Sequence, residues 1–160
     1  MPNDFNAKDI FEIAIKIEQN GAVFYRDAAK TVDESVHKEF LLELAAMEDE
    51  HEITFAAMLK ELAENETFNS TFDPEDENIL YIKALADTRV FFEKERPDNS
   101  LKSILSAAVQ AEKDSITFYL GMKEMIPEKL GKSKIDEIIK EEMRHIRLLA
   151  GKLTEYKDLV

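Results

Sequence analysis

The segment LLELAAMEDEHEITFAAMLKEL, from Leu41 to Leu62, decides the fold. It contains no Gly or Pro, and alternating steps of three and four residues follow one face of an α-helix. That face carries Leu41, Leu44, Glu48, His51, Phe55, Met58 and Leu62. An apolar stripe with a period of about 3.5 residues is the seam by which a helix packs into a bundle. The sequence therefore predicts a buried helix with Glu48 and His51 at the middle of its seam.

Three other segments have the same plan. Each seam is mainly apolar and has a glutamate near its midpoint; one seam also contains a serine, and the last adds a histidine three residues after its glutamate. The seams consist of Phe11, Ala14, Glu18, Ala22 and Tyr25; of Leu101, Leu105, Ala108, Glu112, Ser115, Tyr119 and Met122; and of Ile135, Ile138, Glu142, His145 and Leu149. Residues three or four apart lie on one face of a helix, so the glutamate and the histidine point the same way.

The chain also repeats itself. AIKIEQNGAVFY (14–25) matches AVQAEKDSITFY (108–119) at an offset of 94 residues, and the same offset carries Glu48 onto Glu142 and His51 onto His145. In both halves 30 residues separate the two seam glutamates, so a hairpin that turns midway places them at one level. The sequence predicts two antiparallel helical hairpins built on one plan.

These patterns predict an all-α protein, a four-helix bundle that forms a single domain over residues 1–160. We expect helices at 8–31 and 34–63, a third from the cap Ser100 to 126, and a fourth after Pro127 that reaches 157. A polar, acidic loop and a short fifth helix within 79–92 are expected between the second and third helices. Such a long connection lets the third helix start at the end of the bundle opposite to where the second finishes.

Composition narrows the class of protein. A formal net charge of −13 argues against a nucleic-acid or membrane-surface binder, and 44% hydrophobic residues suffice for a core. The absence of cysteine excludes disulfides, thiolate nucleophiles, zinc fingers and iron–sulfur clusters. No apolar run approaches the length of a membrane span, and the N-terminus lacks a signal-peptide pattern. We expect a cytoplasmic protein with neither nucleic acid nor membrane as a partner.

The buried seam glutamates require an explanation. Four carboxylates that face each other in an apolar core are very unfavourable if they are ionised and unpaired. Two divalent cations would balance their four negative charges, with neutral imidazoles as further ligands. A single Glu-x-x-His on a helix is usually solvated, but here two copies share a seam and each has a partner glutamate 30 residues upstream. The predicted metal ligands are Glu18, Glu48, His51, Glu112, Glu142 and His145.

Several neighbouring residues are candidates for supporting roles. Tyr25 and Tyr119 lie seven residues after Glu18 and Glu112; they are either core aromatics or donors of hydrogen bonds to ligand carboxylates. Glu141 can orient His51 across the bundle, whereas Met47, at the equivalent place in the repeat, cannot. Gly21 either opens space beside Glu18 for oxygen or peroxide or permits close helix packing.

On these residues the chain resembles the ferritin-like superfamily, most closely the erythrin domain of rubrerythrins. The resemblance rests on Glu18, Glu112, the two Glu-x-x-His pairs and the two Phe-Tyr dipeptides. It implies a ferritin-like bundle with two iron ions, or manganese or zinc. It also implies reduction of hydrogen peroxide or dioxygen, or oxidation of ferrous iron, with Glu18, Glu48, Glu112 and Glu142 as catalytic residues. In this hypothesis Glu48 and Glu142 bridge the ions, Glu18 and Glu112 are terminal, and each histidine binds one ion.

Departures from the family pattern shape the functional expectation. Typical rubrerythrins add a rubredoxin domain, a glutamate where this chain has Ser115, and another where it has His145, so the ligand set is closer to that of bacterioferritin. Without cysteine, the electron donor must be a separate protein or molecule. Three functions stay open: a di-iron oxidoreductase, a ferroxidase or iron-handling protein, and a non-catalytic metal-binding bundle. We also expect a homodimer, in which Phe91 and Phe92 either form the contact or pack over the bundle.

Overall fold

The computed structural model describes residues 6–64, 75–88 and 98–158, and within these ranges the protein is built from helices. The long helices are α1 (Ala7–Thr31), α2 (Ser35–Ala63), α4 (Leu101–Met125) and α5 (Lys132–Asp158). A short helix α3 (Glu77–Thr88) precedes α4, and the 3-10 helix η2 (Glu128–Leu130) joins α4 to α5. The all-α four-helix bundle expected from the sequence is confirmed, and the ends of the first three long helices and the C-terminal end of α5 agree with the expectation within one residue. The fourth helix starts later than expected, because η2 occupies the residues directly after Pro127.

Local signals in the sequence set these boundaries. Asn6 and Asp9 form a capping box at the start of α1, and the Ser100 hydroxyl accepts the amide of Ser103 at the start of α4. Gly131 adopts a left-handed conformation with φ of 108°, which few other residues tolerate, and α5 starts directly after it.

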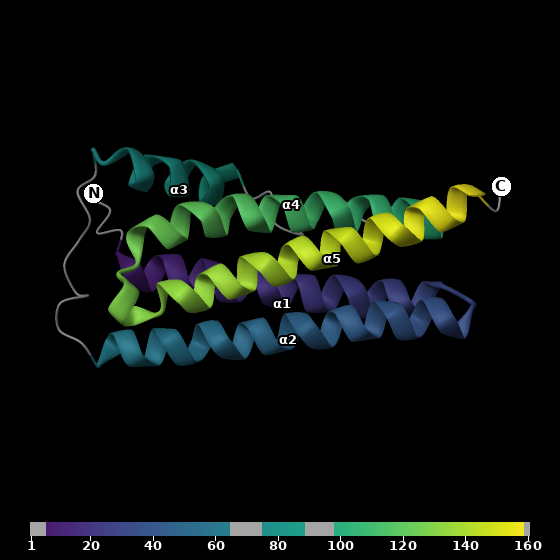
Figure 1. Ribbon diagram of the computed structural model, residues 1–160, viewed down its shortest axis with the longest axis horizontal. Coiled ribbons are helices and arrows are strands. Elements are labelled where there is room, and N and C mark those ends of the chain that lie inside the picture. Colours follow the sequence, from purple (N-terminus) through teal and green to yellow (C-terminus); the bar gives the residue numbers. More distant parts are fainter. Residues whose placement is uncertain (1–5, 65–74, 89–97, 159–160) are drawn as a thin grey trace.

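The order of the helices places the two hairpins side by side (Figure 1). α1 and α2 run in opposite directions, as do α4 and α5, and each pair is joined by a short turn. α2 ends at one end of the bundle and α4 starts at the other, so the connection between them crosses the length of the molecule. This is the long connection that the sequence predicts.

The short helix differs in position from the expectation of 79–92. It starts at Glu77, because the Asp76 carboxylate accepts the backbone amides of Asn78 and Ile79 and so caps the first turn. The described part of α3 ends at Thr88, so Phe91 and Phe92, the expected dimer or packing residues, lie outside the described residues.

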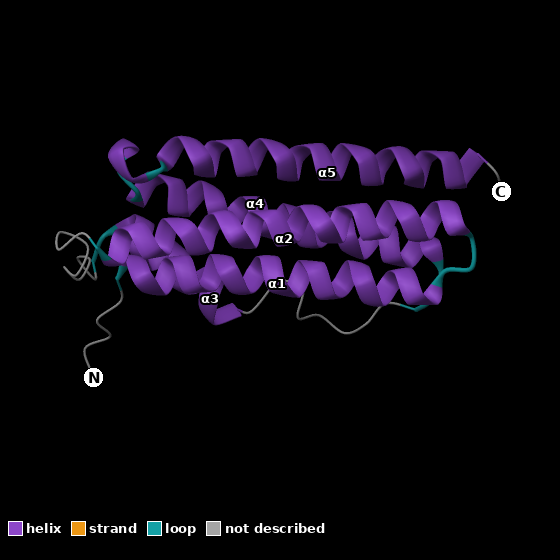
Figure 2. Ribbon diagram, turned by 90° about the horizontal axis from the view of Figure 1, so that it is seen from below, coloured by secondary structure: helices purple, strands orange, loops and turns teal. Residues whose placement is uncertain are grey.

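α3 packs on the outside of α4 (Figure 1). Figure 2 shows the long helices running side by side along the length of the bundle. The Tyr81 hydroxyl donates to the Thr117 carbonyl oxygen at 2.9 Å, and Ile82 is fully buried. A Cβ atom built on Gly121 would lie 2.7 Å from the Tyr81 ring, so the absence of a side chain there permits this close approach.

Two apolar clusters fill the bundle. One contains Phe11, Phe55, Phe118 and Tyr119, and the other contains Tyr25, Leu41, Leu105 and Leu149. The charged seam residues of the four long helices belong to neither cluster, although they are as deeply buried. In the described part of the chain, no helix combines the length and the apolar character needed to cross a membrane.

Candidate metal centre

Six charged or titratable side chains meet inside the bundle. Glu18 comes from α1, Glu48 and His51 from α2, Glu112 from α4, and Glu142 and His145 from α5; all are at most 3% exposed. Each occupies the seam position that the heptad pattern assigns to it, so the packing that buries the apolar neighbours also buries these groups. All six residues that the sequence singles out are therefore brought together.

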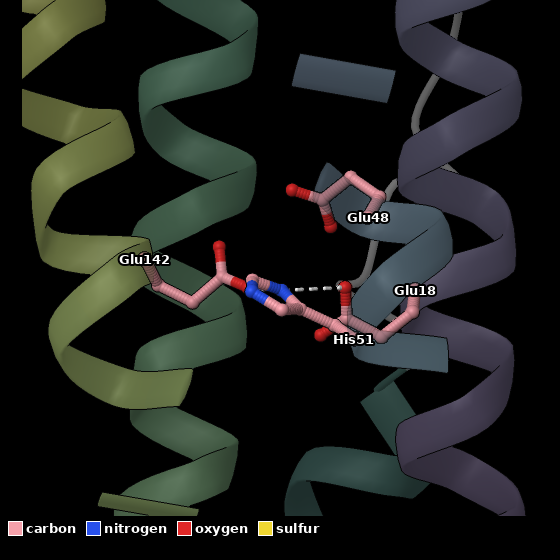
Figure 3. Close-up of side chains that lie close together, drawn as sticks. All are labelled: Glu18, Glu48, His51 and Glu142. Carbon is pink, nitrogen blue, oxygen red and sulfur yellow. Dashed lines mark ion pairs between the residues drawn. The ribbon is translucent and has the colours of Figure 1, made fainter. Parts of the chain in front are cut away.

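The six side chains form two overlapping groups. One consists of Glu18, Glu48, His51 and Glu142, and the other of Glu48, Glu112, Glu142 and His145; within each group the potential ligand atoms lie within 4.8 Å of one another. Figure 3 shows the first group, with its side chains pointing into the space between the helices. Glu48 and Glu142 belong to both groups, whereas each of the other four residues belongs to one.

The histidines face this centre through the same ring atom. Nδ1 of His51 lies 2.8 Å from Glu142 Oε1 and 3.4 Å from Glu18 Oε2. Nδ1 of His145 lies 3.1 Å from Glu48 Oε1 and 3.3 to 3.4 Å from oxygens of Glu142 and Glu112. The two imidazole rings are nearly parallel, at 18°, with centroids 5.7 Å apart, as expected if a repeat places them equivalently.

The inward-facing atoms lack ordinary partners. Within the described part of the chain, seven of them make no hydrogen bond of ordinary geometry, and they are Oε2 of Glu18, Oε1 of Glu48, Oε2 of Glu112, both oxygens of Glu142, and Nδ1 of both histidines. The two Nδ1 atoms lie within ion-pair distance of carboxylate oxygens, but two imidazoles cannot balance four carboxylates. Buried polar atoms are normally satisfied, and an unpaired buried carboxylate is costly. Carboxylate oxygens and imidazole nitrogens are ligands for iron, manganese and zinc, and two divalent ions match the charge of four carboxylates. The residues present fit a pair of metal ions.

Titration in the metal-free centre reflects this crowding of carboxylates. Burial raises the pKa of Glu48 well above its usual value, and the charges of Glu142 and Glu112 add to the effect. Burial and Glu142 raise the pKa of Glu112 to about 8. Burial lowers the histidine pKa values, but carboxylate neighbours outweigh it and raise the pKa of His51 to about 11 and that of His145 to about 9. Without cations, protons neutralise much of this centre.

Two tyrosines tie the hairpins together at the centre. The Tyr25 hydroxyl on α1 donates to Glu112 Oε1 on α4 at 2.5 Å, and the Tyr119 hydroxyl on α4 donates to Glu18 Oε1 on α1. Burial and the nearby carboxylates raise the pKa of both phenols well above 10, so the hydroxyls keep the protons that they donate. Of the two interpretations of these buried tyrosines, the structure supports hydrogen bonds to the predicted ligands, and each contact crosses from one hairpin to the other.

The outer ring nitrogens of the histidines have different partners. Nε2 of His51 lies 2.5 Å from Oε2 of Glu141, and Nε2 of His145 lies 3.2 Å from the sulfur of Met47. The offset of 94 residues carries Met47 onto Glu141, so these are the same contact of the repeat with different chemistry. Glu141 therefore makes the contact with His51 that an orienting role requires.

Gly21 lies closest to a different glutamate from the one expected. A Cβ atom at Gly21 would lie 2.9 Å from Glu48 Oε2, so the glycine makes room for Glu48 rather than for a space beside Glu18. Its repeat equivalent is Ser115, whose hydroxyl donates to the Ala111 carbonyl oxygen at 3.0 Å and so turns back to its own helix.

A pocket of about 410 Å³ lies between α2 and α5 on the outer side of His51. Its lining includes His51, Glu141, Glu50, Lys134 and Glu137. Glu50, Glu137 and Glu141 lie off the apolar seams, and all three are exposed. Their position at a pocket beside the centre was missed, because it depends on the separation of two helices from different hairpins, on which a single-helix pattern carries no information.

Comparison with known proteins agrees with this geometry. A helical bundle that directs paired carboxylates and histidines inward is typical of ferritin-like diiron-carboxylate proteins. The rubrerythrin family model matches residues 9–92, and the chain belongs to the rubrerythrin family. A crystal structure of a protein from Thermotoga maritima, assigned as a ferritin-like diiron-carboxylate protein, is similar, with a TM-score of 0.71 and 25% identity over 95% of this chain and 97% of that one. No curated protein gives a significant match.

Proposed function

We propose that the protein is a di-iron carboxylate oxidoreductase that reduces hydrogen peroxide or dioxygen with electrons from a separate donor. The observation that carries this proposal is the convergence of four buried glutamates and two buried histidines, seven of whose inward atoms make no hydrogen bond of ordinary geometry in the described part of the chain. Membership of the rubrerythrin family and similarity to a ferritin-like diiron-carboxylate protein support it.

In this proposal the four glutamates and two histidines hold the metal ions. Glu48 and Glu142 would be shared between two ions, because they belong to both groups, while Glu18 and His51 would complete one position and Glu112 and His145 the other. A bound pair of iron ions supplies two electrons to an O–O bond and can be reduced again. Manganese and zinc are compatible with the same ligands.

The chain itself supplies orientation and exclusion of water. Tyr25 and Tyr119 hold the carboxylates of Glu112 and Glu18 by hydrogen bonds, which limits their rotation. Apolar residues on both sides of the centre, among them Phe55 and Leu44, are 0% and 1% exposed and restrict the entry of water. The reduction of H₂O₂ to two waters takes two protons and two electrons. The chain has no cysteine with which to bind a rubredoxin-type iron, so we expect the electrons to come from another molecule.

Anaerobic loading followed by separate additions of the two oxidants tests the proposed function. The protein is loaded with two Fe²⁺ per chain, mixed with H₂O₂ or O₂, and followed by absorbance in a stopped-flow instrument. Rapid oxidation followed by re-reduction with repeated turnover supports the oxidoreductase. Indifference to both oxidants would contradict it and would leave a non-catalytic bundle. A Glu48→Gln variant serves as the matched control for iron bound elsewhere on the acidic surface.

A ferroxidase or iron-handling role is the second candidate. The presence of a histidine from each hairpin, with Ser115 where typical rubrerythrins have a further glutamate, favours it. The net charge of −13 would also attract cations. Under aerobic conditions, continued uptake of iron well beyond two ions per chain would support this role. Saturation at two ions would support the oxidoreductase instead.

A further inference from the structure

The two histidines of the centre differ in the partner of their outer ring nitrogen, Nε2. Both rings direct Nδ1 inward and Nε2 outward. Behind His51 stands the carboxylate of Glu141, and behind His145 stands the thioether of Met47. The ligands themselves are related by the repeat, so this difference is a property of the second layer of residues alone.

The two partners hold a ring with different strength. A carboxylate is a strong acceptor, so it fixes the Nε2–H tautomer and leaves the Nδ1 lone pair directed into the centre. A thioether sulfur is a weak acceptor and fixes the ring much less firmly. Partners of this kind behind a metal-ligating histidine typically change metal affinity or activity by about 10–100-fold when they are mutated.

The Glu141 contact also persists when an ion binds. It is made through Nε2, whereas the ion would bind Nδ1, so metal loading does not compete for the hydrogen bond. A divalent ion held at Nδ1 would place positive charge close to the Glu141 carboxylate and strengthen the attraction. The His145 ring gains no such attraction from Met47, which is neutral.

We propose that the two metal positions are inequivalent: the Glu18–His51 position holds a resident ion, and the Glu112–His145 position holds an exchangeable one. Glu141 acts as the positioning residue that retains the resident ion through His51. The inference rests on the metal centre of the proposed function and adds to it an order of release. It applies to any divalent ion that the six ligands accept.

Release of Co²⁺ into a chelator tests this order. The protein is loaded with two Co²⁺ per chain and mixed with excess EDTA, and the loss of the visible Co²⁺ absorption is recorded. We expect two phases of equal amplitude whose rates differ by about 10–100-fold. Crystals exposed briefly to EDTA should retain anomalous scattering at the Glu18–His51 position and lose it at the other.

Variants built on the repeat separate the role of Glu141 from general charge. Glu141→Met gives both histidines a methionine behind Nε2 and should accelerate the slow phase toward the rate of the fast one. Met47→Glu should slow the fast phase. In the double variant with Met47→Glu and Glu141→Met, crystals exposed to EDTA should lose the ion at the Glu18–His51 position first. Glu137→Gln is the matched control, because Glu137 lines the same pocket one turn from Glu141 and makes no hydrogen bond to His51, both residues lying in the described part of the chain. This control should leave both phases unchanged.

Three results would overturn the inference: release in a single phase, earlier loss of the ion beside His51, or equal effects of Glu141→Met and Glu137→Gln. Each of them would leave the metal centre intact, because two ions would still be bound. Failure to bind two Co²⁺ ions would refute the metal centre itself, and with it this inference.

Discussion

The two hairpins of this protein agree in their inner residues and differ in their outer ones. Glu18, Glu48 and His51 of the first correspond to Glu112, Glu142 and His145 of the second, and the tyrosines at 25 and 119 correspond as well. Beyond this layer Gly21 corresponds to Ser115 and Met47 to Glu141. The two halves are identical in the groups that face the centre and in the tyrosines that hydrogen-bond to them, and they differ in the residues behind the histidines and beside Glu48. The comparison therefore isolates the effect of these outer residues on one set of inner groups.

Replacement of a carboxylate shared by both ligand groups should have the largest effect on metal affinity. Glu48→Gln removes a charge from both ligand groups, whereas Glu18→Gln removes one from a single group. Removing one partner from a buried charge pair costs about 3–5 kcal/mol, so affinity at the affected position should fall by about 100-fold or more. Equilibrium dialysis with Co²⁺ should show weakening of both ions in Glu48→Gln and of one ion in Glu18→Gln. Equal loss in both variants would argue against shared ligands.

Metal affinity should rise with pH. In the metal-free protein the raised pKa values of His51, about 11, His145, about 9, and Glu112, about 8, mean that these groups carry protons at pH 7. Bound cations displace them, so each displaced proton strengthens apparent binding by about tenfold per pH unit below the pKa. Calorimetry in two buffers of different ionisation enthalpy, from pH 6 to 8, measures the protons released. A metal affinity that is independent of pH would contradict the claim that protons occupy these groups in the metal-free protein.

The two cross-hairpin tyrosines should contribute similarly to stability. Tyr25→Phe and Tyr119→Phe each remove a fully buried donor to a carboxylate of the opposite hairpin. An unsatisfied buried acceptor costs about 1–3 kcal/mol, and that loss should appear in the free energy of unfolding of the metal-free protein, measured with urea. Tyr81→Phe, whose residue is 40% exposed, is the control and should cost about 0.5 kcal/mol or less. If Tyr25→Phe and Tyr119→Phe cost no more than this control, the hydroxyls do not tie the hairpins together.

A smaller effect is expected from the Gly21 and Ser115 pair. Gly21→Ala should stabilise α1 by up to about 1 kcal/mol through helix propensity, yet the new Cβ would press on Glu48 Oε2 and weaken metal binding a few-fold. Ser115→Ala removes only a hydroxyl bonded to its own helix and should leave metal binding unchanged. Urea unfolding without metal and Co²⁺ titration measure the two effects separately. Stronger metal binding in Gly21→Ala would contradict the contact.

The sequence predicts the helices and the inward side chains well because both follow from periodicity. A polar residue that interrupts an apolar seam is placed by that seam, so Glu18 and His145 could be located without coordinates. The equal spacing within the two hairpins predicts that the carboxylates meet at one level. The start of α3 was predicted less accurately. The apolar pattern begins at Ile79, whereas the Asp76 carboxylate caps a helix that begins two residues earlier.

Contacts between the hairpins lie beyond what a seam pattern specifies. Tyr25 was expected near a ligand carboxylate, but the pattern does not indicate that its partner is Glu112 on the opposite hairpin. The sequence left open whether Gly21 makes space beside Glu18 or permits close packing of helices, and its Cβ position faces Glu48 of the neighbouring helix α2. The pocket beside His51 depends on the separation of α2 and α5. These features require the relative positions of helices, which amphipathic periodicity does not encode.

Anomalous scattering from crystals of protein loaded with two metal ions per chain tests the central claim most directly. We expect two peaks inside the bundle, one beside Glu18 and His51 and one beside Glu112 and His145, with Glu48 and Glu142 next to both. Peaks confined to the acidic surface, or a loaded crystal in which these side chains bind no metal, would contradict the account.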